Sequence, residues 1–253
     1  MRAIILGSGS KGNSTLLIGK NKKILIDVGF SYPKMLMDLN EYNILPSEID
    51  AIILTHTHKD HIAGLSTFIK KNHTMVYTNN NMLPEVLKLI SEDVVNVMDD
   101  VYTIGEFNIL AIHTSHDAPG SVGFVVSDEE SNLVYVTDTG YINKKYLKEL
   151  VNKDVYIFES NHDINMLMNG PYPYILKQRV LSDKGHLSNE LSGTYLKEII
   201  GDKTKRIILA HLSEINNTPE IALDTVKGIL NNDIVKIETA SQNTSFDIGE
   251  IND

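Results

Sequence analysis

A short apolar run, Ala51 to Leu54, is followed directly by the sequence Thr-His-Thr-His-Lys-Asp-His at residues 55–61. An aliphatic run with β-branched residues, bounded by polar residues, is typical of a buried strand. Residues 62–69 then carry apolar side chains at helical spacing. The histidine-rich stretch is therefore predicted to lie in the loop between a strand's carboxyl end and a helix, where α/β proteins usually place their chemistry.

The spacing of this stretch indicates metal binding. His56 and His58 are two residues apart, so their imidazoles point to the same side of an extended segment and can hold one ion. Asp60 and His61 are adjacent in a turn, diverge, and can face a second ion. Imidazole and carboxylate without thiolate suit Zn, Mn or Fe. The alternative, a solvated histidine-rich loop, is disfavoured because similar residues recur at later strand ends.

Composition limits the class of protein. A chain of 253 residues that is 42% hydrophobic is globular and forms one or two domains. No apolar segment approaches the roughly 18 to 20 residues of a membrane span, and the apolar start is too short for a signal peptide. The absence of cysteine excludes disulfides and thiolate ligands. We expect a cytoplasmic protein without membrane contact.

The net charge of −10 argues against a generally basic nucleic-acid-binding surface. It does not exclude a phosphodiester substrate, because two bound divalent ions would reverse the charge locally.

The rest of the chain alternates strand and helix signals. Strands are predicted at residues 3–6, 15–18, 23–27, 51–54, 75–77, 101–104, 107–113, 121–127, 132–137 and 206–210, and helices at 31–39, 62–71, 83–90 and 188–200. The glycine-rich loop at residues 7–14 is either a hairpin turn only or also a phosphate contact. Hairpin turns are predicted at residues 105–106 and 128–131. Hairpins in both halves, flanked by helices, predict two mixed sheets with helices outside. Without a low-complexity linker, we expect one domain over residues 1–253.

Three further candidate ligands follow apolar strands. His116 lies in a loop after a strand and is preferred to His113, which falls at the strand's end. Asp138 and His211 each follow an apolar strand directly. All these residues share one structural position, so they should converge on one rim. We predict that one ion is held by His56, His58 and His116, the other by Asp60, His61 and His211, and that Asp138 bridges them.

Together, these motifs resemble the metallo-β-lactamase superfamily over the whole chain. The resemblance implies a four-layer αββα sandwich with a dinuclear site at the sheet edge. Residues 7–14, 182–189 and 210–217 more specifically resemble the bacterial YycJ/VicX/WalJ group. That resemblance implies a metal-dependent nuclease with 5′→3′ exonuclease activity on DNA and a link to mismatch repair.

Two further residues, Glu159 and His186, resemble a pair in the tRNA 3′-processing nucleases of the superfamily. By that resemblance His186 would protonate the leaving oxygen and Glu159 would orient it. The alternative is that His186 merely neighbours the helix that begins near Ser188. Asp27 is expected to be structural rather than a neighbour of the ligands.

Several residues are assigned from their position alone. His73 and His162 are expected at the surface. Four basic residues near the site loops are candidates for contact with a nucleic-acid backbone: Lys11, Lys177, Arg179 and Lys184.

The predicted chemistry is phosphodiester hydrolysis. Two divalent ions, Zn or Mn with Fe as a further option, would acidify a bridging water and clamp the phosphoryl oxygens, with Asp60 among the reacting groups. Flavodiiron proteins usually have Glu at the position of His58, and the chain between Asp138 and His211 is too short for a β-CASP insertion. The alternatives are a hydrolase of a thioester, lactone or cyclic phosphodiester, and an RNA-processing nuclease. A non-catalytic partner is disfavoured because every ligand is present.

Overall fold

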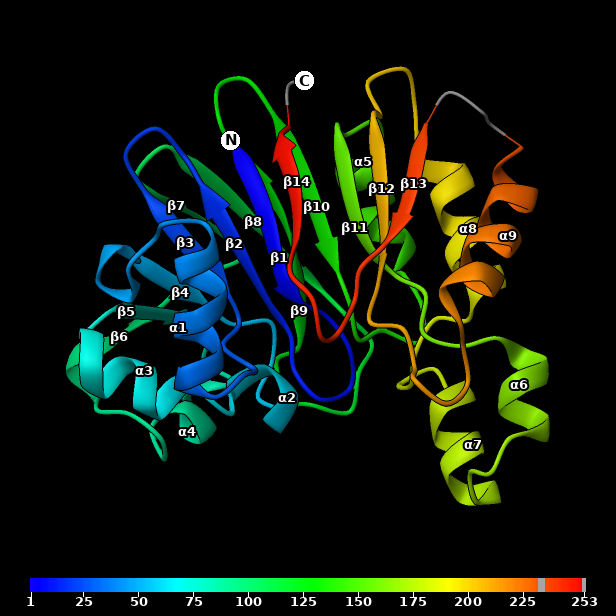
Figure 1. The fold of residues 1–253 in the computed structure, drawn as a ribbon, viewed down its shortest axis with the longest axis horizontal. Coiled ribbons are helices and arrows are strands. Elements are labelled where there is room, and N and C mark those ends of the chain that lie inside the picture. The colour runs from blue at the N-terminus through cyan, green and yellow to red at the C-terminus, as the bar shows by residue number, and fades with distance from the viewer. Residues whose placement is uncertain (232–234, 252–253) are drawn as a thin grey trace.

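Two mixed β-sheets stacked face to face form the centre of the molecule, and helices cover both outer sides (Figure 1). The computed structural model describes residues 1–231 and 235–251. Within these ranges the first sheet has the order β14 (Phe246–Glu250), β1 (Arg2–Gly7), β2 (Ser14–Ile18), β3 (Lys23–Ile26), β4 (Ala51–Ile53), β5 (Met75–Thr78) and β6 (Val95–Val97). The second has the order β13 (Lys236–Thr239), β12 (Arg206–Ala210), β11 (Val155–Glu159), β10 (Asn132–Val136), β9 (Val122–Ser127), β8 (Phe107–His113) and β7 (Val101–Ile104).

The α-helices of the described ranges are α1 (Tyr32–Glu41), α2 (Lys59–Ile62), α3 (Leu65–Asn72), α4 (Leu83–Val86), α5 (Leu147–Leu150), α6 (Ile164–Asn169), α7 (Tyr174–Leu181), α8 (Asn189–Ile199) and α9 (Pro219–Leu230). Short 3₁₀ turns lie at Pro46–Glu48, Glu92–Val94 and Lys144–Tyr146. None of the helices in this part of the chain is long and apolar enough to cross a membrane.

Alternation along the central strands separates two apolar clusters. In β10, Leu133 and Tyr135 belong to the cluster between the sheets, whereas Val134 and Val136 face the cluster under α8 and α9. Both sets are buried because a strand with helices on one side and a sheet on the other exposes neither face. The predicted αββα layering of two mixed sheets is confirmed.

Helix boundaries follow local capping. The Ser188 side chain accepts a hydrogen bond from the Leu191 backbone and begins α8, while Thr218 caps α9 in the same way just before Pro219. The helix predicted at residues 62–71 is divided into α2 and α3. The helix is interrupted at Gly64, whose backbone N–H donates a hydrogen bond to the carbonyl of Val28 at 2.9 Å.

Other boundaries also differ from the sequence prediction. The strand predicted to end at Asp27 ends one residue earlier, at Ile26, because Asp27 has a left-handed backbone with φ of 62°. The helix predicted at 83–90 is regular only over α4. The hairpins predicted at residues 105–106 and 128–131 join β7 to β8 and β9 to β10 as expected. The glycine-rich loop 7–14 joins the antiparallel strands β1 and β2.

Candidate metal centre

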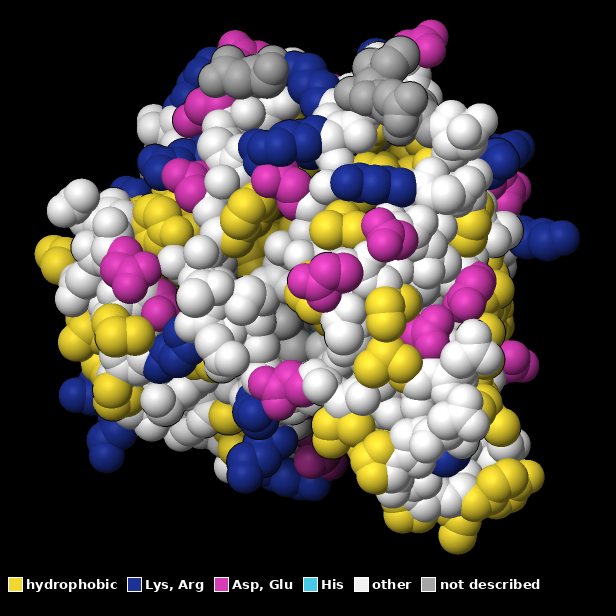
Figure 2. Space-filling model, turned by 45° about the vertical axis from the view of Figure 1, so that its right-hand side comes forward, with side chains coloured by type: hydrophobic (Ala, Val, Ile, Leu, Met, Phe, Trp, Pro, Cys, Tyr) yellow, Lys and Arg dark blue, Asp and Glu magenta, His cyan; other side chains and the backbone are white. Residues whose placement is uncertain are grey.

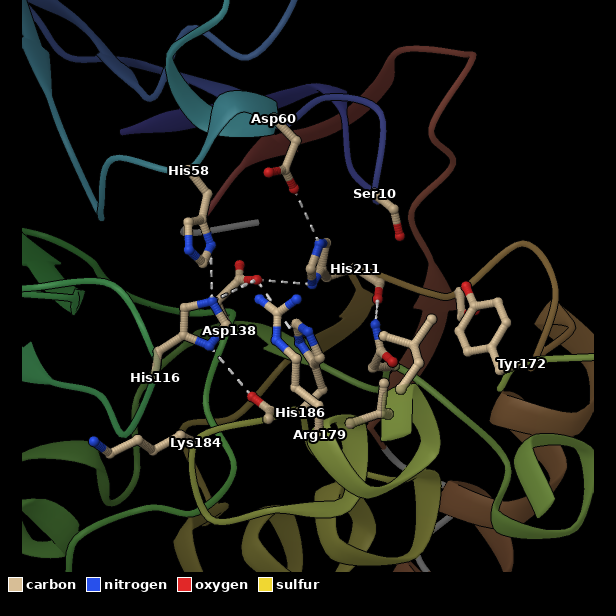
Figure 3. Close-up of a pocket in the computed structure, with 15 residues that line it drawn as sticks. Ser10, His58, Asp60, His116, Asp138, Tyr172, Arg179, Lys184, His186 and His211 are labelled. Carbon is tan, nitrogen blue, oxygen red and sulfur yellow. Dashed lines mark hydrogen bonds and ion pairs between the residues drawn. The ribbon is translucent and has the colours of Figure 1, made fainter. Parts of the chain in front are cut away.

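The candidate ligands lie in loops at the carboxyl ends of strands from both sheets. The loop after β4 carries four of them, and single ligands follow β8, β10 and β12. The two sheets bring these loops together at one edge of the sandwich, where they line a cleft of about 270 Å³ (Figure 3). The residues brought together are His56, His58, Asp60, His61, His116, Asp138 and His211.

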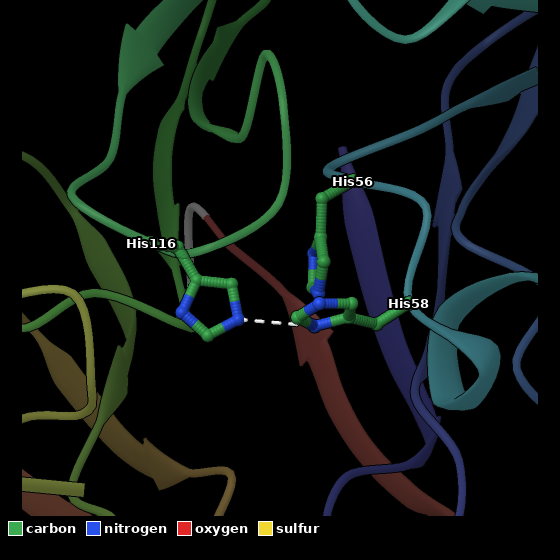
Figure 4. A group of neighbouring side chains, drawn as sticks. All are labelled: His56, His58 and His116. Carbon is green, nitrogen blue, oxygen red and sulfur yellow. Dashed lines mark hydrogen bonds between the residues drawn. The ribbon is translucent and has the colours of Figure 1, made fainter. Parts of the chain in front are cut away.

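One trio comprises His56, His58 and His116, whose rings converge on a common point (Figure 4). Nitrogen atoms of all three rings lie within 4.8 Å of one another. Nε2 of His116 is 3.1 Å from Nδ1 of His58. Ligand atoms at about 2 Å from one ion lie at such separations, so this trio can hold one metal.

A second trio comprises Asp60, His61 and His211. Oδ2 of Asp60 is 3.5 Å from Nε2 of His61 and 3.7 Å from Nε2 of His211. Asp60 and His61, which are adjacent in the turn, both face this second group, whereas His58 faces the first.

Asp138 lies between the two trios. Its Oδ2 is 3.3 Å from Nε2 of His61, and its Oδ1 is 3.3 Å from Nδ1 of His211 and 3.9 Å from Nε2 of His116. The Asp138 carboxylate therefore lies within 4 Å of ligands of both groups.

Buried polar atoms without hydrogen bonds mark where a cation fits. Nε2 of His56, Oδ2 of Asp138 and Nε2 of His211 are buried and form no hydrogen bond with any residue that the structure describes. Such atoms are costly unless another partner satisfies them. Imidazole nitrogens and a carboxylate oxygen are donors that divalent metals take. The residues therefore fit divalent metal ions.

Electrostatics agree with that fit. Burial lowers the pKa of His56 well below its ordinary value, so the ring is neutral and keeps a lone pair for a cation. Burial opposes the charge on Asp138, but the neighbouring His211 and His61 outweigh it and hold its pKa well below the ordinary range. Burial likewise opposes a charged His211, yet Asp138, Asp60 and Glu159 raise its pKa to about 10. A cation would take the place of that proton.

Asp27 supports His61. Its carboxylate is fully buried and accepts hydrogen bonds from the Thr55 backbone at 2.8 Å and the Thr55 hydroxyl at 2.6 Å. Its Oδ2 also lies 2.7 Å from Nδ1 of His61, which fixes the ring and leaves Nε2 toward the site. The preferred interpretation of Asp27 as merely structural is wrong: it is a neighbour of a candidate ligand.

The backbone at three strand ends is left-handed. Asp27, Asp138 and His211 have φ values of 62°, 57° and 56°. Such a backbone is uncommon for residues other than glycine and is found mostly where function or packing requires it. It turns each side chain abruptly out of its strand toward the cleft.

The glycine-rich loop 7–14 holds two of the ligand-bearing segments in place, those of His211 and Asp60. The Ser8 hydroxyl accepts a hydrogen bond from the His211 backbone at 2.9 Å, and the Asn13 backbone donates to the Asp60 carbonyl at 2.8 Å. Gly29 packs against both the loop and the Asp60 segment, because a Cβ there would lie 2.5 Å from the Asn13 backbone nitrogen and 1.8 Å from the Asp60 carbonyl oxygen. The loop therefore supports the site, and phosphate contact stays a prediction.

Glu159 and His186 form a pair beside the second trio. Nδ1 of His186 is 2.7 Å from Oε1 of Glu159, and the Thr139 backbone donates to Oε2 at 2.9 Å. Burial would raise the pKa of Glu159, but His186 and His211 lower it to about 2. Glu159 is therefore placed to orient His186 and His211, since its Oε1 also lies 3.2 Å from Nδ1 of His211. With Asp138, these three residues form a further group whose ligand atoms lie within 4.8 Å of one another.

The remaining predicted residues lie in different places. His113 is half exposed at the end of β8 and pairs with Asp100, and His73 is exposed at the end of α3. His162 was predicted at the surface, and this is wrong: it is 1% exposed. Its backbone carbonyl accepts a hydrogen bond from the backbone N–H of Asn189, so the residue lies against the first turn of α8.

The four basic candidates divide into two groups. Arg179 and Lys184 line the cleft, whereas Lys11 pairs with Glu214 on a neighbouring surface and Lys177 donates to the Met168 carbonyl. Asp117, which follows His116, accepts hydrogen bonds from Arg179 and lies 3.3 Å from His58. Asp117 was not singled out from the sequence, and its position next to His116 is the feature of the sequence that could have indicated a place at the site.

Comparison with known proteins gives a consistent result. A family model described as the metallo-beta-lactamase superfamily matches residues 7–211. The exodeoxyribonuclease WalJ of Streptococcus pneumoniae serotype 2 is 38% identical over 225 residues, 86% of this chain and 84% of that protein. The exodeoxyribonuclease YycJ of Bacillus anthracis is 35% identical over 233 residues, 89% and 88% respectively. The crystal structure of the metallo-beta-lactamase fold protein YhfI from Bacillus subtilis has a TM-score of 0.73 at 20% identity and covers 98% of this chain and 100% of its own, which supports the fold alone.

Proposed function

This chain belongs to the metallo-β-lactamase superfamily, and from that membership and the geometry of its cleft we propose that it is a metal-dependent exodeoxyribonuclease acting in the 5′→3′ direction. Two relatives at 38% and 35% identity over most of the chain are named exodeoxyribonucleases. The observation that carries the proposal within this molecule is the Glu159–His186 pair. It stands beside the candidate metal ligands without being needed as a ligand.

We propose the metal ligands from the geometry of the two trios. His56, His58 and His116 would hold one divalent ion, Asp60, His61 and His211 the other, and Asp138 would contact both. Zn and Mn suit nitrogen and oxygen donors without thiolate, with Fe as a further option. When bound, the ions would supply a nucleophilic water at neutral pH and polarise the phosphoryl oxygens.

His186 and Glu159 would handle the proton of the leaving group. Because Nδ1 of His186 faces Glu159, Nε2 is the nitrogen left to meet a substrate in the cleft. Glu159 would hold the ring in that orientation, and His186 would give its Nε2 proton to the leaving oxygen. Asp60 would help to place the water for attack. A thioester hydrolase with the same metal ligands would have no use for this pair, because a thiolate leaves without taking up a proton.

The first test is digestion of 5′- and 3′-labelled DNA and RNA, single and double stranded, with added Mn²⁺ or Zn²⁺ and with EDTA controls. Release of nucleotides from DNA 5′ ends that EDTA abolishes would support the proposal. Turnover of a thioester, lactone or cyclic phosphodiester with no polymer cleavage would overturn it, and preferential cleavage of RNA would favour an RNA-processing nuclease.

Variants separate metal binding from proton transfer. Asp138→Ala should lose both metal and activity. His186→Ala should keep the metal and lose about 10²- to 10⁴-fold in rate on DNA, but far less on a p-nitrophenyl nucleotide ester, whose leaving group needs no proton. His113→Ala, a half-exposed histidine away from the cleft, is the matched control. Equal losses on both substrates would remove His186 from the acid role.

We infer further that residues 1–253 form one domain without a β-CASP insertion. β14 returns from the end of the described chain to pair with β1, which supports a single unit. The link to DNA repair and the cytoplasmic location stay predictions.

A further inference from the structure

Helices α6 and α7 project from the body of the molecule beyond the ends of the strands (Figure 1). The segment between them, Gly170 to Pro173, and the inner side of α7 reach back to the metal cleft. Tyr172, Leu176 and Val180 line this cleft together with the candidate ligands. In the close-up, Tyr172 lies at one end of the group and His58 and His116 lie at the other (Figure 3). One wall of a polar metal cleft is therefore apolar and aromatic.

Tyr172 has no internal partner that explains its place. Within the described part of the chain its ring contacts no other aromatic ring or cation, and no hydrogen bond involves its hydroxyl. It lies between Pro171 and Pro173, whose fixed φ angles restrict the segment. A restricted aromatic ring loses little conformational entropy when a ligand stacks on it.

Both ends of the α6–α7 projection are tied to catalytic loops. At its start, the Asp163 backbone donates to the carbonyl of Asn216, in the loop that follows His211, at 2.9 Å. A Cβ at Gly170 would lie 2.8 Å from the Asn216 side chain, so the two segments are in close contact. At its end, the His186 backbone donates to the Val180 carbonyl at 3.0 Å. These hydrogen bonds thus fix the position of the apolar wall of Tyr172, Leu176 and Val180 relative to His186, the proposed general acid.

Basic side chains that line the same cleft suit the phosphates of a nucleic-acid backbone. Lys184 lines the cleft and forms no ion pair within the described residues, while Arg179 pairs with Asp117. In one cleft, the metal site and the cation suit the phosphates of a nucleic acid, and the apolar aromatic wall suits a base.

We propose that Tyr172, with Leu176 and Val180, forms a nucleobase subsite. The base of the nucleotide adjoining the scissile bond leaves its neighbours and stacks on Tyr172 while its phosphodiester lies at the metal ligands. Stacking on an aromatic ring tolerates any base, so the subsite would select an unpaired end rather than a sequence. This inference rests on the proposed nuclease function.

The outer surface of the projection provides the control residue. Figure 2 shows apolar side chains gathered on this part of the molecule. Among the residues of α7, Tyr174 is 72% exposed and does not line the cleft. Tyr174→Ala therefore removes the same chemical group, two residues away, without touching the proposed subsite.

The test compares Tyr172→Ala, Tyr172→Phe and Tyr174→Ala with the unmodified protein on two single-stranded DNA substrates. One carries a normal terminal nucleotide and the other an abasic analogue at that position. Tyr172→Ala should lower kcat/KM on normal DNA by about 5- to 150-fold, the equivalent of one lost base–aromatic stack. Tyr172→Phe and Tyr174→Ala should retain activity, and on abasic DNA the unmodified protein and Tyr172→Ala should react alike.

Each other outcome overturns part of the reasoning. If Tyr172→Ala is as active as the unmodified protein on normal DNA, or loses as much on abasic as on normal DNA, the subsite is wrong. Metal content and melting temperature are measured for every variant, and a change there would assign Tyr172 a structural role. If the unmodified protein cleaves no DNA, the nuclease function fails first and the subsite with it.

Discussion

Replacing Asp27 by Asn tests how the site is supported. The substitution keeps the size of the side chain but removes its charge and one of its two acceptor oxygens. Three donors now share that carboxylate: the Thr55 backbone, the Thr55 hydroxyl and the His61 ring. An amide cannot accept from all of them, so at least one donor would face an NH₂ group.

The expected size of the effect follows from two independent considerations. A buried hydrogen bond to a charged group contributes about 1.5–3 kcal/mol. Loss of a residue that orients a metal-binding histidine typically reduces metal affinity about 10- to 100-fold, which corresponds to about 1.4–2.8 kcal/mol. The two ranges agree, so we expect Asp27→Asn to bind metal about 10- to 100-fold more weakly and to lose DNA cleavage at limiting metal.

The assay is competition for Zn²⁺ against a chromophoric chelator, with thermal unfolding in EDTA to report on the metal-free fold. Asp100→Asn is the matched control, because Asp100 holds His113 at 2.8 Å in an exposed pair away from the cleft. The control should bind Zn²⁺ normally. Unchanged affinity in Asp27→Asn, or equal weakening in both variants, would refute the assigned role.

Two further predictions concern backbone packing and pH. Gly29→Ala places a Cβ against the Asp60 carbonyl and should destabilise the protein by about 1–3 kcal/mol. Gly228→Ala in α9, where a Cβ meets nothing within 4 Å, should instead stabilise it by about 0.5–1 kcal/mol. If urea unfolding ranked the two variants in the reverse order, this description of the packing would be wrong. The hydrogen bond from Arg2 holds the pKa of Asp247 below its ordinary value. This pair therefore stabilises the fold at pH values above the unfolded carboxyl pKa of about 3.9. The stabilisation is lost as the pH falls through the lower pKa of the folded state. Because both side chains are about a third exposed, Asp247→Asn should cost about 0–1 kcal/mol at neutral pH and less in acid, and a cost that persisted in acid unfolding experiments would show another cause.

The candidate site was predictable because its chemistry is concentrated in few residue types at recognisable positions. Histidine and aspartate directly after short apolar runs, as at His56 and His211, point to strand ends, and parallel strand ends meet at one edge. His116 was separated from His113 by the same reasoning. Proximity of the ligands in space therefore followed from their shared position along each strand.

Other features depend on contacts between distant parts of the chain. The break at Gly64 is set by a hydrogen bond to Val28, and the limit of the third strand by the left-handed backbone of Asp27. His162 carries no local sign of burial, because the segment that covers it begins after Ser188. Tyr172 stands in a proline-rich turn, which predicts a loop and gives no indication that the loop borders the cleft.

The origin of the ligands in both sheets has a consequence for folding kinetics. The loop after β4 belongs to the first sheet, whereas His116, Asp138 and His211 follow strands of the second. A complete pair of trios therefore exists only after the two sheets have docked. Interactions that are absent from the folding transition state leave the folding rate unchanged and slow unfolding instead. If the sheets dock only after the folding transition state, bound metal would govern the lifetime of the native protein rather than the speed at which it is reached.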